Sequence, residues 1–342
     1  MQLSPGKLLG MKKLSDERGL FKMTAIDQRP PIKGPIAKYH NVTEAPWDEV
    51  AKFKRMLVDT LQDNSSALLL DPHYAIPHAI DILKPTNGLV ITLEDSNFED
   101  NGGGRFSKSI DNWSVSKIKR MGGDAVKVLA WFRPDADENV INAQKDYVKK
   151  IGEECTRYDI LFLLELLVYP LPKDNNQTND YIEMKEKKSD HVLKSVEDFS
   201  SSKYGVDVFK LESPVNADKL QEDDLSVFEE LGKLAGRPWV MLSAGAGKDE
   251  FKKVLQLAFK AGASGFLAGR AIWLDAFKNY PDWERIKFDL VNFSVPYLSE
   301  IGSLTESNAQ PWNKHLCYGS KGYKFEFPSA DFRYKYHDMS SK

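Results

Sequence analysis

The sequence predicts an α/β protein, a single-domain (βα)8 TIM barrel. Eight short apolar segments recur along the chain, and most are apolar at successive positions, as in parallel strands buried on both faces. Amphipathic stretches of helix length lie between them. Residues 248–261 are an example, because Phe251, Leu255 and Ala258 fall on one helical stripe. Eight such units favour a closed barrel over an open doubly wound sheet.

The elements follow one another regularly. A short N-terminal helix should end between Ser15 and Gly19. Strands are expected at 20–27, 67–71, 88–93, 124–129, 160–166, within 206–216, and at 238–243 and 264–269. Helices are expected at 48–64, 114–121, 138–157 and 248–261. Two longer connections, 94–112 with its three glycines and the charged segment 170–190, should either cover the barrel mouth or be disordered.

The barrel accounts for residues 1–312, with the N-terminal helix included. The segment 313–342 is aromatic and basic and has no place in the eight-fold count. We therefore expect it to be a C-terminal extension. It could cap the barrel, make a subunit contact in a homo-oligomer or reach a site, and the sequence does not choose among these.

Composition and charge restrict the setting. Hydrophobic residues make up 42% and charged residues 28%, as in a soluble protein with a sizeable core. A net charge of −3 gives no basic surface for nucleic acid. The two cysteines are too few for a disulfide scaffold, and the N-terminus lacks the apolar core of a signal peptide. The longest apolar run, 160–171, is too short for a membrane span. We expect a cytoplasmic protein without a membrane partner.

Charged side chains gather at one end of the predicted barrel. In the stretch 206–216, Lys210 and Glu212 point the same way, because side chains alternate along a strand. For an isolated strand this would describe a solvated pair at a sheet edge. In a barrel, working groups lie at the carboxyl ends of the strands. Those ends carry Asp27, Lys127, Glu165, Lys210, Ser243 and the pair Gly269–Arg270. Since unpaired buried charges are costly, a catalytic set is the favoured interpretation over structural ion pairs.

These residue types suit covalent catalysis. A lysine held between apolar walls and beside a second cation loses its proton more easily, and the free amine attacks a carbonyl. The resulting Schiff base withdraws electrons and allows a neighbouring carbon–carbon bond to break. That step needs a group that moves protons. Glu165 lies among leucines and a phenylalanine, so we expect burial to raise its pKa as this role requires.

Two glycine-containing segments predict a phosphate site. Residues 243–247 follow the seventh strand, and Gly269–Arg270 follow the eighth, the usual place for phosphate in this fold. The Gly-Ala-Gly-Lys sequence is not a nucleotide-binding P-loop, because Leu242 and Asp249 occupy positions that need glycine and serine or threonine. The six histidines show no ligand spacing, so no metal or other cofactor is expected. His73 and His78 are interpreted as surface or lid residues.

An ordered set of motifs resembles the class I tagatose-1,6-bisphosphate aldolases. The motifs are LSDERG at 14–19, AIDQR at 25–29, LLDP at 69–72, DAVK at 124–127, FLLE at 162–165, VFKLESPVN at 208–216, LSAG at 242–245 and AGRAIW at 268–273. By this resemblance Lys210 would form the Schiff base and Glu165 would be the acid and base. Asp27 and Lys127 would position the substrate hydroxyls and tune Lys210. The substrate and its phosphates would be bound by Ser243, Ala244, Gly245, Gly269, Arg270, Arg29 and Gln28.

The resemblance implies reversible cleavage of a ketohexose bisphosphate, D-tagatose 1,6-bisphosphate first, to dihydroxyacetone phosphate and glyceraldehyde 3-phosphate. Fructose 1,6-bisphosphate and sulfofructose 1-phosphate remain alternative substrates. A catalytically silent sugar-phosphate-binding barrel with a regulatory role is a more distant alternative. A nucleotide-binding enzyme is the weakest, since no nucleotide motif is formed. The chain departs from the family at Pro30 and Pro31, which could reshape the distal phosphate pocket, and in the extension after Trp312. The role of Glu212 stays open.

Overall fold

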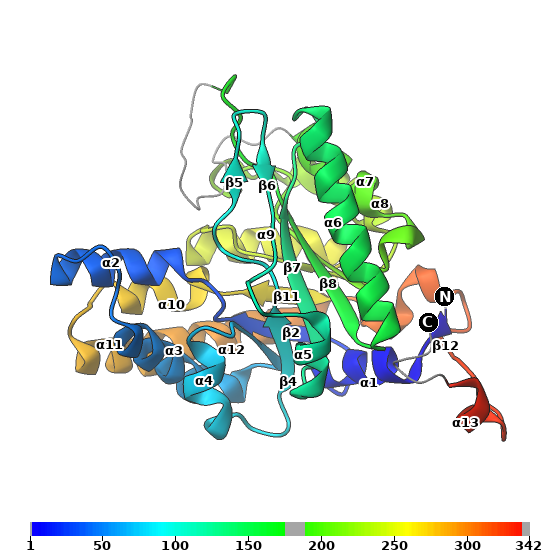
Figure 1. The fold of residues 1–342 in the computed structure, drawn as a ribbon, viewed down its shortest axis with the longest axis horizontal. Coiled ribbons are helices and arrows are strands. Elements are labelled where there is room, and N and C mark those ends of the chain that lie inside the picture. The colour runs from blue at the N-terminus through cyan, green and yellow to red at the C-terminus, as the bar shows by residue number, and fades with distance from the viewer. Residues whose placement is uncertain (1, 175–188, 337–342) are drawn as a thin grey trace.

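The computed structural model describes residues 2–174 and 189–336. Within these ranges, parallel strands alternate with helices and close into an eight-stranded barrel (Figure 1). Around the barrel the order is β10 (Trp239–Met241), β11 (Gly265–Ala268), β2 (Phe21–Ala25), β3 (Ala67–Leu70), β4 (Gly88–Thr92), β7 (Ala125–Trp131), β8 (Leu161–Leu167) and β9 (Val208–Leu211). The predicted fold class is therefore confirmed, and each predicted strand lies within two or three residues of its expected position.

Strand alternation explains which side chains enter the barrel. Val208 packs inside with Ala125 and Leu163, whereas Phe209 and Leu211 pack outward against the helices. Lys210 therefore points inward, two residues beyond Val208. The interior floor is apolar and is made by Met23, Ala67, Val90, Ala125, Leu163, Val208, Val240 and Leu267. The barrel interior is thus apolar at this level, and the charged side chains form a layer nearer the carboxyl ends of the strands.

Lys127 lies deeper along its strand than the sequence indicates. β7 was expected to end at Leu129 but continues to Trp131, so Lys127, its third residue, lies four residues before the end of the strand. It pairs in register with Leu163 of β8, two residues before Glu165. The long lysine side chain covers this offset, and its ammonium reaches the level of the carboxylates described below.

Helices surround the strands (Figure 1). The main ones are α3 (Trp47–Leu61), α5 (Val115–Arg120), α6 (Glu138–Arg157), α7 (Ser189–Phe199), α8 (Leu225–Ala235), α9 (Lys248–Lys260), α10 (Arg270–Phe277), α11 (Trp283–Asp289) and α12 (Val295–Asn308). An additional helix, α2 (Pro30–His40), begins at the two prolines, which suit a first helical turn because its amides have no partner within the helix. It was not expected, because a third proline, Pro35, interrupts its pattern.

The lower end of the barrel is closed by the two ends of the chain. α1 (Pro5–Leu14) covers the N-terminal ends of the strands, and its Met11 and Leu14 pack with Trp312 and Tyr318. β1 (Gln2–Leu3) pairs in parallel with β12 (Lys324–Phe325). The described part of the extension, which includes α13 (Phe332–Lys335), thus lies at the end opposite the charged layer.

The connection 94–112 is structured. It forms the antiparallel hairpin β5 (Glu99–Asp100) and β6 (Arg105–Phe106), which rises above the barrel in Figure 1. Arg105 anchors it, with its guanidinium 4.1 Å, 4.7 Å and 4.9 Å from the ring centres of Phe98, Trp131 and Tyr169. Most of the second expected loop, 170–190, lies outside the described residues. Within those residues, no helix combines the length and apolarity needed to cross a bilayer.

Candidate active site

Lys127 lies at the centre of the charged layer. Its Nζ is 2.9 Å from Oδ2 of Asp27, 2.6 Å from Oε1 of Glu94 and 2.7 Å from Oε2 of Glu165. The lysine side chain is buried, and so are all three carboxylates. One ammonium cannot neutralise three carboxylates, so the cluster depends on the further cations beside it.

Lys210 is the second cation. Its Nζ lies 2.9 Å from Oε2 of Glu165, the same oxygen that contacts Lys127. Glu165 and Lys210 are paired across β8 and β9, which holds the two side chains at the same height. A third cation, Arg29, donates from Nη2 to the backbone carbonyl of Glu94 at 3.1 Å. Glu165 is therefore placed to exchange a proton with either lysine.

The prediction that the pKa of Glu165 is raised is wrong. Burial alone would raise the pKa of this carboxyl, but the charges of Lys127 and Lys210 outweigh burial and lower it. The pKa of Asp27 is lowered for the same reason, against the effect of burial. The sequence shows the apolar neighbours of Glu165 along the strand but not the two ammonium groups across the barrel. Both carboxyl groups are ionised in this state.

A pocket opens above Lys210. It is narrow, with a cavity volume of about 20 Å³. Its walls bring together most of the residues that the sequence predicted for catalysis and phosphate binding: Asp27, Gln28, Glu165, Lys210, Ser243, Ala244, Gly269 and Arg270. Lys127 lies beneath it and supports Asp27 and Glu165. Gly245 follows Ala244 in the turn, and both have left-handed backbone conformations. Arg29 lines a neighbouring pocket instead.

One end of this pocket depends on a close approach between two backbone segments. Gly269 directly precedes α10, and a Cβ atom there would lie 2.6 Å from the carbonyl oxygen of Ala25. Only glycine fits this position without displacing β2. The start of α10 carries Arg270, so helix amides and a guanidinium face the same place. The N-terminus of a helix with an arginine beside it attracts an anion.

Comparisons with known proteins identify the family of this chain. The family model described as "DeoC/LacD family aldolase" matches residues 21–275. The chain belongs to this aldolase family. Tagatose 1,6-diphosphate aldolase 1 of Enterococcus faecalis is 33% identical over 80% of this chain and 86% of its own length. Tagatose 1,6-diphosphate aldolase 2 of Streptococcus mutans is 30% identical over 93% of this chain and 100% of its own.

Solved structures support the fold. A Schiff-base-forming fructose-1,6-bisphosphate aldolase superposes with a TM-score of 0.56 and 16% identity, over 87% of this chain and 99% of that one. At this identity the likeness concerns the barrel alone. Membership of the DeoC/LacD family rests on the family model and on the two sequence relatives.

Sequence reasoning missed Glu94 in this aldolase-family chain. Glu94 lies two residues beyond the end of β4, as Asp27 lies two residues beyond the end of β2, but it was taken as the first residue of a loop. The rule that strand ends carry the working groups applies to Glu94 as well. Its Oε2 is buried and has no hydrogen-bond partner among the described residues. The orphan oxygen, like Oδ1 of Asp27, is available to a substrate hydroxyl.

A fully buried ion pair beside the site was also missed. Lys54 of α3 contacts Asp71 and donates to the carbonyl of Ile26 at 2.9 Å, one residue before Asp27. Asp71 accepts from the backbone amides of His73 and Tyr74, each at 2.9 Å. Burial lowers the pKa of Lys54, although the charge of Asp71 opposes this. The pair joins a helix to the ends of β2 and β3. In the sequence, Lys54 lies on the apolar stripe of α3, and this position could have indicated that the lysine is buried.

Glu212 has a backbone partner. Its Oε1 accepts from the amide of Val168 at 2.7 Å, which ties the segments that follow β8 and β9 to each other. The sequence placed Glu212 on the same face as Lys210 only because alternate residues of a strand point the same way. The contact with Val168 gives it a structural function at the barrel mouth.

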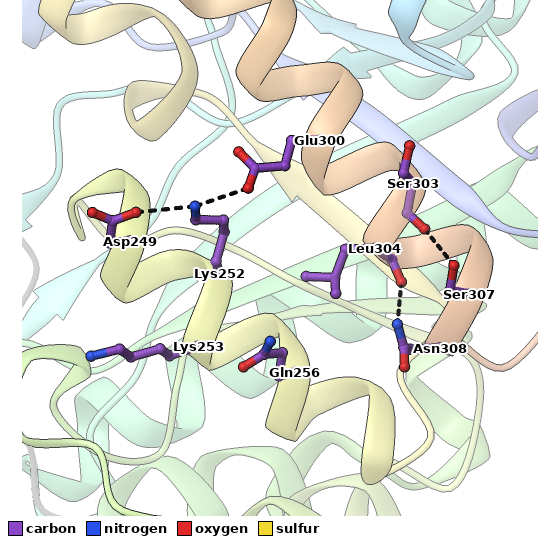
Figure 2. Close-up of a pocket in the computed structure, with 9 residues that line it drawn as sticks. All are labelled: Asp249, Lys252, Lys253, Gln256, Glu300, Ser303, Leu304, Ser307 and Asn308. Carbon is purple, nitrogen blue, oxygen red and sulfur yellow. Dashed lines mark hydrogen bonds and ion pairs between the residues drawn. The ribbon is translucent and has the colours of Figure 1, made fainter.

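A larger hollow lies on the helix layer, away from this chemistry. Figure 2 shows it between α9 and α12, where Lys252 bridges Asp249 at 3.1 Å and Glu300 at 3.0 Å. Its remaining walls are mostly serine, asparagine and glutamine side chains. It holds ≈ 780 Å³. Lys252 already has two carboxylate partners, so size alone does not make this hollow a reaction site.

Proposed function

We propose that this chain is a cytoplasmic class I aldolase that reversibly cleaves D-tagatose 1,6-bisphosphate to dihydroxyacetone phosphate and glyceraldehyde 3-phosphate. The observation that carries the proposal is the contact of 2.9 Å between Lys210 and Glu165 at the base of the pocket. An amine beside a group that moves protons is what imine chemistry requires. The relatives named as tagatose 1,6-diphosphate aldolases support the choice of sugar.

In this proposal the Nζ of Lys210 attacks the C2 carbonyl of the open-chain ketose. Glu165 accepts a proton from the ammonium and returns one to the hydroxyl that leaves as water, so that an iminium ion forms. Glu165 then accepts the C4 hydroxyl proton, the C3–C4 bond breaks to give the aldehyde, and the bonding electrons move into the iminium to form an enamine. The aldehyde departs, Glu165 returns the proton to C3 of the enamine, and water then releases dihydroxyacetone phosphate and the free amine.

The positions of the other residues in and below the pocket suggest their roles. Asp27 holds a substrate hydroxyl, Lys127 beneath the pocket keeps Asp27 and Glu165 in position, and Glu94 fixes Lys127. Ser243, Ala244, Gly245, Gly269 and Arg270 bind the phosphate nearer the imine, with Gln28 at the pocket wall. The lowered pKa of Glu165 fits a base in the resting enzyme. When the Lys210 ammonium gives up its proton and its nitrogen becomes part of the neutral carbinolamine, one cation is lost beside Glu165, so the carboxyl holds its proton more readily and acts as an acid toward the leaving hydroxyl.

Borohydride trapping tests this proposal. Incubation with the sugar bisphosphate or with dihydroxyacetone phosphate and borohydride should leave a stable adduct on Lys210, located by peptide mass spectrometry. Turnover should survive EDTA. An adduct on Lys127 instead, or loss of turnover with EDTA, contradicts the assignment. Binding without turnover or adduct would favour a regulatory barrel. Kinetics on tagatose 1,6-bisphosphate, fructose 1,6-bisphosphate and sulfofructose 1-phosphate identify the preferred substrate.

A further inference from the structure

Asp27 lies beyond the end of its strand. β2 ends at Ala25, and Asp27 follows two residues later, at the wall of the catalytic pocket. Its Oδ2 is 2.9 Å from Nζ of Lys127, and its Oδ1 has no hydrogen-bond partner among residues 2–174 and 189–336. The position of this second oxygen relative to Lys210 therefore depends on what fixes the backbone that leads out of β2.

Three hydrogen bonds to different elements hold this backbone. The indole Nε1 of Trp273, on α10, donates to the carbonyl of Ala25 at 3.1 Å. The amide of Ile26 donates to the carbonyl of Leu69, in β3, at 2.8 Å. The ammonium of Lys54, on α3, donates to the carbonyl of Ile26 at 2.9 Å. Because that carbonyl belongs to the peptide unit shared with the aspartate, the lysine fixes the plane from which the aspartate side chain leaves.

The charge of Lys54 is fully buried, and its ion-pair partner Asp71 is buried with it. A buried ion pair is often no more stabilising than apolar side chains of the same size, because both charges lose their hydration. Asp71 is fixed in turn by the backbone amides of His73 and Tyr74. An apolar residue would fill the space of the lysine, but it could not donate to the carbonyl of Ile26.

We propose that Lys54 is a positioning residue for catalysis: through the carbonyl of Ile26 it holds Asp27 where the carboxylate meets a substrate hydroxyl, and Asp71 keeps Lys54 in place. The proposal rests on the aldolase function proposed above. It adds a residue that does not line the pocket and whose effect on turnover is separate from its effect on stability.

Two variants separate the contact with Ile26 from the ion pair. Lys54→Met combined with Asp71→Asn removes the contact and both charges, while the asparagine oxygen still accepts from His73 and Tyr74. Asp71→Asn alone removes the ion pair and leaves the lysine in place. Burial already lowers the pKa of Lys54, so without its partner the lysine can lose a proton, and the neutral amine still donates to the carbonyl.

Steady-state cleavage of D-tagatose 1,6-bisphosphate, per folded molecule, compares the two variants. In the double variant kcat/KM should fall about 10- to 100-fold, because a displacement of about 1 Å in a positioning group has an effect of this order. In Asp71→Asn it should stay close to the wild-type value. Urea unfolding should show the double variant to be at least as stable as Asp71→Asn, since methionine buries no polar group. The less active variant is then not the less stable one.

A buried lysine–aspartate pair at the opposite end of the barrel provides the matched control. Nζ of Lys7, on α1, lies 2.8 Å from Oδ2 of Asp207, which also accepts from the amide of Phe162 at 2.8 Å. Asp207 directly precedes β9, at the N-terminal ends of the strands. Lys7→Met combined with Asp207→Asn should therefore keep the wild-type kcat/KM. An equal loss in this control would show that removing any buried pair lowers turnover, and would overturn the positioning role.

A double-mutant cycle tests whether the effect passes through Asp27. In an Asp27→Ala background, adding Lys54→Met and Asp71→Asn should change kcat/KM little, because no carboxylate is left to displace. Full additivity of the two losses would place the action of Lys54 elsewhere and contradict the proposal.

The outcomes also separate the positioning role from the aldolase function. If the wild type cleaves the sugar but the double variant keeps the wild-type kcat/KM, or Asp71→Asn alone loses as much, the positioning role is wrong and the aldolase function stands. If the wild type neither cleaves the sugar nor gives a borohydride adduct with dihydroxyacetone phosphate, the aldolase function fails and the positioning role fails with it.

Discussion

Glu165 and Lys210 face each other from paired positions of neighbouring strands, with Oε2 of the glutamate 2.9 Å from Nζ of the lysine. The same oxygen lies 2.7 Å from Lys127. A proton on Lys210 can therefore pass to a base that a second ammonium keeps ionised. This relationship makes Lys127 a positioning residue for Glu165, and it leads to the first two predictions.

Glu165→Gln should lower kcat about 10²- to 10⁴-fold, the usual range for losing a proton-transferring group. Glutamine keeps the size of the side chain and a carbonyl oxygen for the lysines, so the fold should survive. Rapid-quench kinetics and the rate of borohydride trapping on Lys210 measure the effect. Glu153→Gln, at an exposed site on α6, serves as the control. Unchanged kcat in Glu165→Gln would remove this residue from the mechanism.

Lys127→Met should reverse the pH dependence of stability. In the wild type the folded-state pKa values of Asp27 and Glu165 lie below their ordinary values of 3.8 and 4.5. Their contribution is therefore complete above about pH 4.5 and is lost as pH falls through the folded-state pKa values. Without the ammonium, burial should raise the pKa values of the carboxyls around it. Stability should then decline as pH rises from about 4 to about 7.

Urea unfolding at a series of pH values measures this slope. Lys84→Met is the matched control, because Lys84 pairs with Asp63 at the surface. The control should keep the wild-type slope. Equal slopes in Lys127→Met and the wild type would contradict the buried network as the origin of the shifts.

Lys54→Met should destabilise the protein by about 3–5 kcal/mol, because it leaves Asp71 buried and unpaired. Adding Asp71→Asn should recover part of the loss, since the amide oxygen still accepts from His73 and Tyr74 while the charge is gone. Denaturant unfolding of the two variants measures the difference. A double variant less stable than Lys54→Met alone would show that the charge of Asp71 is satisfied by something other than Lys54.

Trp312→Ala should cost about 3–5 kcal/mol of stability, as for other large buried side chains. Trp312 is 2% exposed and packs with Met11, Leu14 and Tyr318. The values of kcat and KM per folded molecule should stay unchanged, because this cluster lies opposite the pocket. Thermal unfolding and activity assays at low temperature test both statements, with the 85% exposed Leu316→Ala as control. A selective loss of activity would mean that the extension 313–342 reaches the site.

The sequence indicated most of the barrel, because short apolar strands and amphipathic helices produce regular patterns. It also predicted which side chains meet in the pocket, since parallel strands end at one face. It could not predict the direction of the Glu165 shift, which depends on distances across the barrel. The pairing of β1 with β12 was hidden because strands of two residues leave no periodic pattern. Glu94 was overlooked where a strand ends and a hairpin connection begins.

The pairing of β1 with β12 has a consequence for how the chain is made. β12 follows every strand of the barrel, so on the ribosome β1 and α1 emerge long before the segment that completes their cover. Contacts so distant in sequence form slowly, and domains acquire structure as synthesis proceeds. The nascent barrel therefore exposes its apolar lower end until the residues of β12 have been made. Chaperones that recognise apolar surface should bind the growing chain there, and release it once Trp312 and the residues after it have left the exit tunnel.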